Sequence, residues 1–301
     1  MSGSAIAGVS PAVAGAKALA LVAVLAGSLA YATESDSDLT KATLDLVRVR
    51  GGDFRSVLPT RGPNGAGVRV MPFALQRTPV TNREFLAFVR THAQWQRGRV
   101  TPDQADSHYL QSWAGPLQLG QAVSADQPVT GVSWFAARAF CESHKARLPS
   151  WNEWEFAAAA DDRVGDARRD PAWRRTALEW FSRTPDVPLS AVGRTTPNIY
   201  GVRDLHGLVW EWVDDFESLF ASANGPGVEH DSAADRNSAH ATHPAGHESM
   251  PMSPAAMAMS CGGAALAVAD PEDYPTILRL AMLASLQPNS STANLGFRCA
   301  R

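Results

Sequence analysis

The chain has 301 residues, of which 45% are hydrophobic and 19% charged, and its formal net charge is −3 at pH 7. This length can bury one large core or two smaller ones. The ordinary composition and slightly negative charge give no reason to expect a nucleic-acid partner. Nine tryptophans indicate a loop-rich fold held by buried aromatic side chains rather than a regular helix bundle.

Residues 1–32 have the pattern of an export signal. Lys17 precedes the apolar run 18–26, and Ala30-Tyr31-Ala32 has the small-x-small pattern of a signal-peptidase site. The alternative is an uncleaved anchor, but the apolar run is shorter than the ~20 residues that span a membrane. We therefore expect a periplasmic or secreted protein, which would contact a membrane only through this segment if it stays uncleaved. In an oxidising compartment, three cysteines predict one disulfide and one odd thiol.

The first predicted elements are a strand and two capped helices. Residues 44–57 have strand character and include a Gly-Gly turn. Thr81 to Glu84 is a capping box, in which each end residue bonds the backbone of the other, and Ser133 caps the second helix. The apolar face of the first helix is expected to carry Phe85, Phe88 and Val89. That of the second is expected to carry Ala137, Phe140, Cys141 and His144.

Two more helices follow. Ser150 to Glu153 is a second capping box, which opens a helix through Ala160. Asp170 is an N-cap followed by proline at the first helical position, so another helix starts at Pro171. The tryptophans of these two helices are Trp151 and Trp154, which we expect to be buried, and Trp173 and Trp180.

The motif Trp210-Glu211-Trp212 follows a turn with two glycines and an aspartate. A carboxylate between two indoles is costly to bury unless a positive group or several donors meet it. The segment therefore predicts a buried polar site, with a bound cation as one candidate partner.

The second half is expected to contain a long loop and irregular strands. Residues 221–261 are rich in small and polar residues, and this loop is too long to be a simple connection. Structure is expected to resume near Ala264 and to end in a strand within residues 294–301. Helices in the first half and strands in the second predict a single α+β domain.

These blocks together resemble the formylglycine-generating enzyme (sulfatase-modifying factor) family. The resemblance covers residues 45–301 and is carried, in the family's order, by residues 47–54, 78–82, 128–134, 147–155, 200–212 and 294–299. It implies a C-type-lectin-like α+β fold that is poor in regular secondary structure.

The resemblance also implies two structural sites. A calcium site of the family falls on the side chains of Asp204 and Glu211 and the backbone carbonyls of Gly207 and Val209, and oxygen ligands suit that ion. The alternative is a carboxylate that backbone N–H groups satisfy without metal. A structural disulfide of the family falls on Cys141 and Cys299.

The chain departs from the family at the position of its chemistry. Members that make formylglycine carry a cysteine pair shortly after a Gly-Gly-Ser turn, and those thiolates bind Cu(I) and activate oxygen. Here the turn is Cys261-Gly262-Gly263-Ala264, and no cysteine lies between Gly262 and Arg298. We therefore expect the standard activity to be absent. The chain is closer to a branch without these cysteines, similar to accessory proteins of copper nitrite reductases.

The loop 221–261 suggests that copper is bound by side chains other than the family's cysteine pair. Imidazole, thioether and thiol ligands suit Cu(I) or Cu(II) in an exported protein, and a low-complexity surface loop is the alternative. The candidate copper ligands are His240, His243, His247, Met250, Met252, Met257, Met259 and Cys261.

Three functions remain open from the sequence. The first is an exported accessory or maturation factor for a copper-containing periplasmic enzyme such as nitrite reductase. The second is an oxidoreductase with a displaced copper or thiol site, with Cys261 as its thiol. The third is a calcium-stabilised lectin-like binding module without chemistry.

Overall fold

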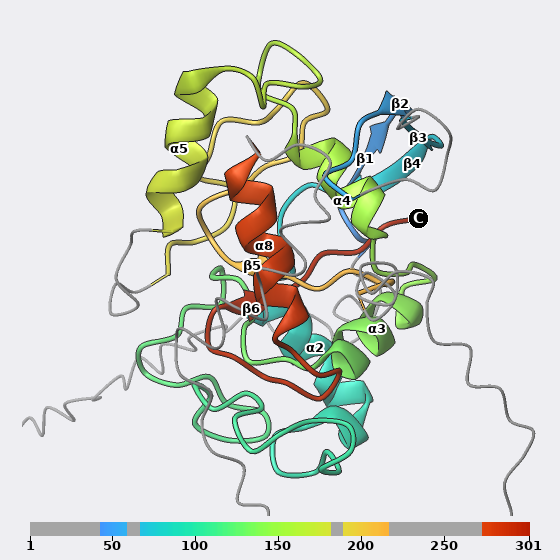
Figure 1. Cartoon of the computed structure of the whole chain (residues 1–301). Coiled ribbons are helices and arrows are strands. Elements are labelled where there is room, and N and C mark those ends of the chain that lie inside the picture. The colour runs from blue at the N-terminus through green and yellow to red at the C-terminus, as the bar shows by residue number, and fades with distance from the viewer. Residues whose placement is uncertain (1–42, 59–66, 182–188, 217–272) are drawn as a thin grey trace, which may run out of the picture.

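A computed structural model describes residues 43–58, 67–181, 189–216 and 273–301 (Figure 1). Within these ranges the fold combines short two-stranded pairings with separate helices and much irregular chain, which confirms the α+β class. The predicted export signal and the loop 221–261 lie outside the described residues. None of the helices in the described ranges is both long and apolar enough to cross a membrane.

The strand predicted over residues 44–57 is two strands. β1 (Leu46–Val49) pairs antiparallel with β4 (Phe73–Gln76), and β2 (Gly52–Phe54) pairs antiparallel with β3 (Val68–Val70). Gly51 makes the turn between β1 and β2 with φ of +69°, and a Cβ there would lie 2.3 Å from the Val70 carbonyl oxygen. Only glycine fits this close approach.

The two capped helices of the first half form as predicted. In α2 (Asn82–Thr91), both halves of the Thr81–Glu84 capping box are present. In α3 (Trp134–Ser143), the Ser133 hydroxyl accepts the N–H of Ala136. A short 3-10 turn, η1 (Ala93–Trp95), follows α2. The expected core residues of the two helices are buried, with His144 only partly so.

The next two helices also begin where their caps predict. α4 (Trp151–Ala158) has the complete Ser150–Glu153 capping box, buries Trp151 and Trp154, and ends at Ala158 rather than Ala160. α5 (Pro171–Phe181) begins after Asp170, whose carboxylate accepts the N–H of Ala172.

The second half contains a helix that we did not predict. β5 (Trp210–Glu211) pairs in parallel with β6 (Leu295–Gly296), but α8 (Tyr274–Ala284) occupies a region where strands were expected. The side chain of Asp273 caps α8, and proline lies in its first turn. In Figure 1, α8 lies beside α5. Arg279 of α8 also donates to the backbone carbonyl of Glu211, so α8 contacts the Trp-Glu-Trp motif.

The residues after β6 pack against helices α2 and α3 of the first half of the chain. Phe297 packs edge-on against Phe85 of α2 and Phe140 of α3, with ring centroids 6.1 and 5.3 Å apart. The disulfide Cys141–Cys299 forms as the family resemblance implied, with a Cα–Cα distance of 5.5 Å. α3 is thereby linked covalently to the last residues of the chain.

Candidate functional site

The carboxylate of Glu211, on β5, is fully buried and bound by protein donors on both oxygens. Arg298 donates from Nη2 to Oε1 and from Nε to Oε2, each at 2.8 Å. The indole Nε1 of Trp154 donates to Oε2 at 2.9 Å. The exposed fraction of both the Glu211 and Arg298 side chains is 0%. The positive partner that the motif required is therefore Arg298, a residue 87 positions further along the chain.

Arg298 is itself completely satisfied. Its remaining N–H groups donate to the backbone carbonyls of Gln76, Arg77 and Arg203 at 3.0, 3.2 and 2.9 Å. A guanidinium has five N–H donors in a fixed fork, and here each one has an acceptor. The pair thus ties β4, β5 and the end of the chain into one buried network.

A second guanidinium, that of Arg279 on α8, lies against the same motif. Its Cζ lies 3.4 Å from the ring centroid of Trp154, and its Nη2 donates to the backbone carbonyl of Glu211. Desolvation lowers the pKa of Arg279 to about 9, with the charge of Arg298 acting in the same direction and that of Glu211 against it. Among the described residues, Nε of Arg279 has no hydrogen-bond partner. Two buried guanidinium groups therefore contact Glu211, Arg298 at the carboxylate and Arg279 at the backbone carbonyl.

The two side chains among the calcium ligands implied by the resemblance, those of Asp204 and Glu211, are buried and accept hydrogen bonds from protein donors. The Asp204 carboxylate accepts the backbone N–H groups of Gly193 and Thr195 and the Thr195 hydroxyl, the last at 2.9 Å. Asp204 has a left-handed backbone with φ of +60°. Gly207 lies in the turn between Asp204 and Glu211, and Val209 directly precedes β5. Both oxygens of the Asp204 carboxylate therefore accept hydrogen bonds from Gly193 and Thr195.

Within the described ranges, no group of three or more His, Cys, Asp or Glu side chains is placed to hold a metal. The surroundings of Glu211 suit the arginine rather than a metal ion. Calcium binding by Asp204, Gly207, Val209 and Glu211 stays a prediction. All eight candidate copper ligands, from His240 to Cys261, lie outside the described residues, and copper binding also stays a prediction.

His206 plays a structural part in this region. Its Nε2 lies 2.8 Å from the carbonyl oxygen of Ala158, and its ring packs edge-on against Trp154 and Trp173. Burial lowers the pKa of His206. The His206 ring, in the turn before β5, therefore links that turn to the end of α4 through the Ala158 carbonyl.

A second buried carboxylate, Glu155 of α4, lies in a separate cluster. It accepts the Ser56 hydroxyl at 2.5 Å, the Val57 backbone N–H at 2.7 Å and Arg168 Nη1 at 3.3 Å, and it is 1% exposed. The same Nη1 lies 3.2 Å from Asp273, the N-cap of α8. One arginine therefore joins α4 to the start of α8.

This cluster holds more negative than positive charge. Asp166 also pairs with Arg168 at 2.7 Å, so three carboxylates share one guanidinium. Burial raises the pKa of Glu155 to about 7, although its bonds to Ser56 and Val57 and the charge of Arg168 act against that rise. Glu155 therefore changes charge in the folded protein near neutral pH.

A pH dependence of stability follows from Glu155. Its pKa is raised from 4.5 to about 7 on folding, so its contribution is fully present below pH 4.5 and is lost as the pH rises to about 7. In urea unfolding between pH 5 and 8, the stability of the wild type relative to Glu155→Gln should fall as the pH rises, because only the wild type loses the contribution of Glu155. The matched control is Glu142→Gln, on the half-exposed side chain that pairs with Arg138, which should keep the wild-type pH dependence. An unchanged pH dependence in Glu155→Gln would contradict the assignment.

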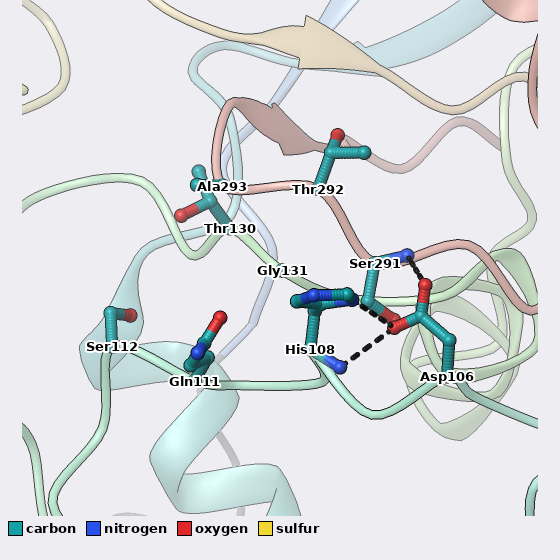
Figure 2. Close-up of a pocket in the computed structure, with 9 residues that line it drawn as sticks. All are labelled: Asp106, His108, Gln111, Ser112, Thr130, Gly131, Ser291, Thr292 and Ala293. Carbon is teal, nitrogen blue, oxygen red and sulfur yellow. Dashed lines mark hydrogen bonds and ion pairs between the residues drawn. The ribbon is translucent and has the colours of Figure 1, made fainter. Parts of the chain in front are cut away.

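A pocket of about 270 Å³ is the other candidate site (Figure 2). Three loop segments form it, and residues as far apart in the chain as Asp106 and Ser291, 185 positions, meet in its wall. That separation explains why no local pattern predicted it. The lining residues are Asp106, His108, Gln111, Ser112, Thr130, Gly131, Ser291, Thr292 and Ala293.

Comparison with known proteins places the chain in a family. The sulfatase-modifying factor enzyme 1-like domain matches residues 31–301. The formylglycine-generating enzyme of Streptomyces coelicolor is 29% identical over an alignment of 328 residues, which covers 93% of this chain and 96% of that protein. The inactive C-alpha-formylglycine-generating enzyme 2 of Bos taurus is 30% identical over 57% of this chain and 70% of its own length.

A solved structure of PvdO from Pseudomonas aeruginosa is also similar. It has 19% sequence identity and a TM-score of 0.42, and the match covers 85% of this chain and 93% of that one. The domain match spans all of the described residues, including both strands and the helix around Glu211. The chain therefore belongs to the formylglycine-generating enzyme (sulfatase-modifying factor) family.

Proposed function

We propose that this protein is an exported accessory factor of the family, without formylglycine-forming activity, that assists maturation of a copper-containing periplasmic enzyme such as a nitrite reductase. One observation supports the absence of formylglycine-forming activity. Cys141 and Cys299 are joined in a disulfide, so only Cys261 remains of the three cysteines in the sequence. Oxygen activation by a pair of thiolates on one copper ion needs two free cysteines.

Two further facts support the proposal. A relative that is 30% identical is itself described as inactive. The copper half rests on the sequence of residues 240–261, which gathers imidazole, thioether and thiol groups in one segment. A segment with these ligands would hold or deliver copper without any catalytic role for the Glu211 network.

The absence of oxidase activity is tested with a peptide. A cysteine-containing sulfatase-type peptide, incubated with the protein, copper and oxygen, should gain no aldehyde by mass spectrometry over many equivalents. The Streptomyces coelicolor enzyme, under the same conditions, is the positive control. Catalytic aldehyde formation that disappears in Cys261→Ser would instead favour an oxidoreductase with a displaced thiol site.

The copper half is tested by Cu(I) competition titration of the full chain. Sub-micromolar binding is expected, and deletion of residues 240–261 should abolish it because the deletion removes all eight candidate ligands. The matched control is a triple alanine variant of His92, His108 and His144, which lie outside the segment and should leave the affinity unchanged. Equal affinity in the deletion variant would remove copper from the proposal.

A further inference from the structure

The pocket of Figure 2 has walls that are fixed before any ligand arrives. Asp106 accepts the backbone N–H groups of His108 and Ser291, at 2.9 and 3.1 Å. Across the pocket, Leu110 donates its backbone N–H to Gly131 at 2.8 Å, and Gly131 donates to Thr292 at 3.0 Å. Backbone hydrogen bonds therefore join all three wall segments to one another.

The same wall contains a strained residue. Leu110 is fully buried and has φ of +48°, a conformation that a leucine adopts at a cost in energy. Its bonded partner, Gly131, also has positive φ, at +66°. Unfavourable backbone of this kind persists only where the surroundings enforce it, and such positions cluster at binding sites. The next residue, Gln111, lines the pocket.

The polar groups left free in the pocket are neutral. Figure 2 shows Gln111, Ser112 and Thr130 at one end and Asp106 with Ser291 at the other. The carboxamide of Gln111 and the hydroxyls of Ser112 and Thr130 have no hydrogen-bond partner in the part of the chain that the structure describes. Each of these side chains can both donate and accept.

The lining excludes several ligand classes. It contains the Asp106 carboxylate and neither lysine nor arginine, so a phosphate, sulfate or carboxylate ligand would meet like charge without a counter-ion. Most of the lining surface is apolar carbon, but no lining residue has a large aliphatic or aromatic side chain other than the exposed His108 ring, so a long lipid chain finds no large side chain to pack against. An uncharged ligand with both carbon and hydrogen-bonding surface remains.

Size and hydrogen-bond character favour a sugar ring. The volume of about 270 Å³ lies just below the roughly 300–1,000 Å³ of pockets that hold drug-sized ligands, so it suits a ligand of about one ring. Sugar hydroxyls donate and accept on the same atom, as do the hydroxyls of Ser112 and Thr130. A peptide unit separates its donor from its acceptor and matches this set less well.

We propose that the pocket binds a single uncharged sugar ring, whose hydroxyls bond Gln111, Ser112 and Thr130 at one end and Asp106 at the other. The site is distinct from the Glu211 network and does not depend on the copper proposal. It needs no metal, because the bonding groups are all side chains of the pocket.

The test is saturation-transfer NMR on the full chain with glucose, galactose, mannose and N-acetylglucosamine. At least one sugar should show saturable binding in the millimolar range. Thr130→Val and Gln111→Leu each remove hydrogen-bonding groups at similar volume, and each should weaken binding about three- to tenfold. Gln121→Leu, on an exposed residue outside the lining, should leave the affinity unchanged.

Thermal unfolding of each variant verifies that it is folded, and Ser112→Ala replaces either one that is not. Saturable binding by none of the four sugars would overturn the proposal. The proposal would also be overturned if the pocket variants bound the sugar with unchanged affinity. Displacement of the bound sugar by short uncharged peptides at equal concentration would overturn it too.

Discussion

Replacement of Arg298 by methionine is expected to lower the free energy of unfolding by about 3–5 kcal/mol, because it leaves the Glu211 carboxylate buried without its cation. The other losses act in the same direction. Three backbone carbonyls, those of Gln76, Arg77 and Arg203, would lose the donors that Arg298 provides. Chemical denaturation followed by tryptophan fluorescence and circular dichroism measures the change.

The double variant Glu211→Leu with Arg298→Met separates charge from packing. It removes the unpaired carboxylate, so it should recover part of the lost stability. The recovery should be incomplete because the Gln76 and Arg203 carbonyls lose the Arg298 donors and the Trp154 indole N–H loses its acceptor. The matched control is Arg69→Met, whose partner Asp53 is exposed, and its effect should stay within about 0.5 kcal/mol. A loss below about 1 kcal/mol in Arg298→Met would refute the structural role of the pair.

Loss of the disulfide is expected to be the other large effect. Cys141 and Cys299 are separated by 158 residues, and closing so long a loop in the unfolded chain is worth roughly 4–5 kcal/mol in the chain-entropy model. Cys141→Ser and Cys299→Ser should each destabilise the protein, and a reducing agent should destabilise the wild type by a similar amount. Denaturant unfolding with and without reductant measures both.

Cys261→Ser serves as the control for this pairing. The structure pairs the other two cysteines, so this variant should keep the full sensitivity to reductant. The two single variants should in turn be insensitive to reductant. If Cys261→Ser abolished the effect of the reductant, the Cys141–Cys299 pairing would be wrong.

The sequence predicted the elements whose signals are local. Each N-cap at Thr81, Ser133 and Ser150 acts within three residues, and all three helices begin where these caps predict. The helix α8 also has local signals, in Asp273 and Pro275, but they follow a long low-complexity stretch that obscures them. Local signals therefore predicted most helix starts. The start of α8 was missed although its local signal is present in the sequence.

The site could be predicted only in part. The need for a positive partner at Glu211 followed from burying a carboxylate between two indoles. The identity of that partner did not, because Arg298 reaches Glu211 through the fold and not along the chain. The pocket around Asp106 was missed for the same reason. The disulfide was predicted from the family resemblance, since counting cysteines leaves the pairing open.

The position of the last residues also determines when the chain can fold. Ala300 bridges to Leu75 beside the first sheet and to Arg147 before α4, and Phe297 lies between α2 and α3. A nascent chain therefore cannot complete its core until synthesis reaches residue 300. Until then α2 and α3 lack their contacts with Phe297, so we expect the packing of this core to be a late step of folding.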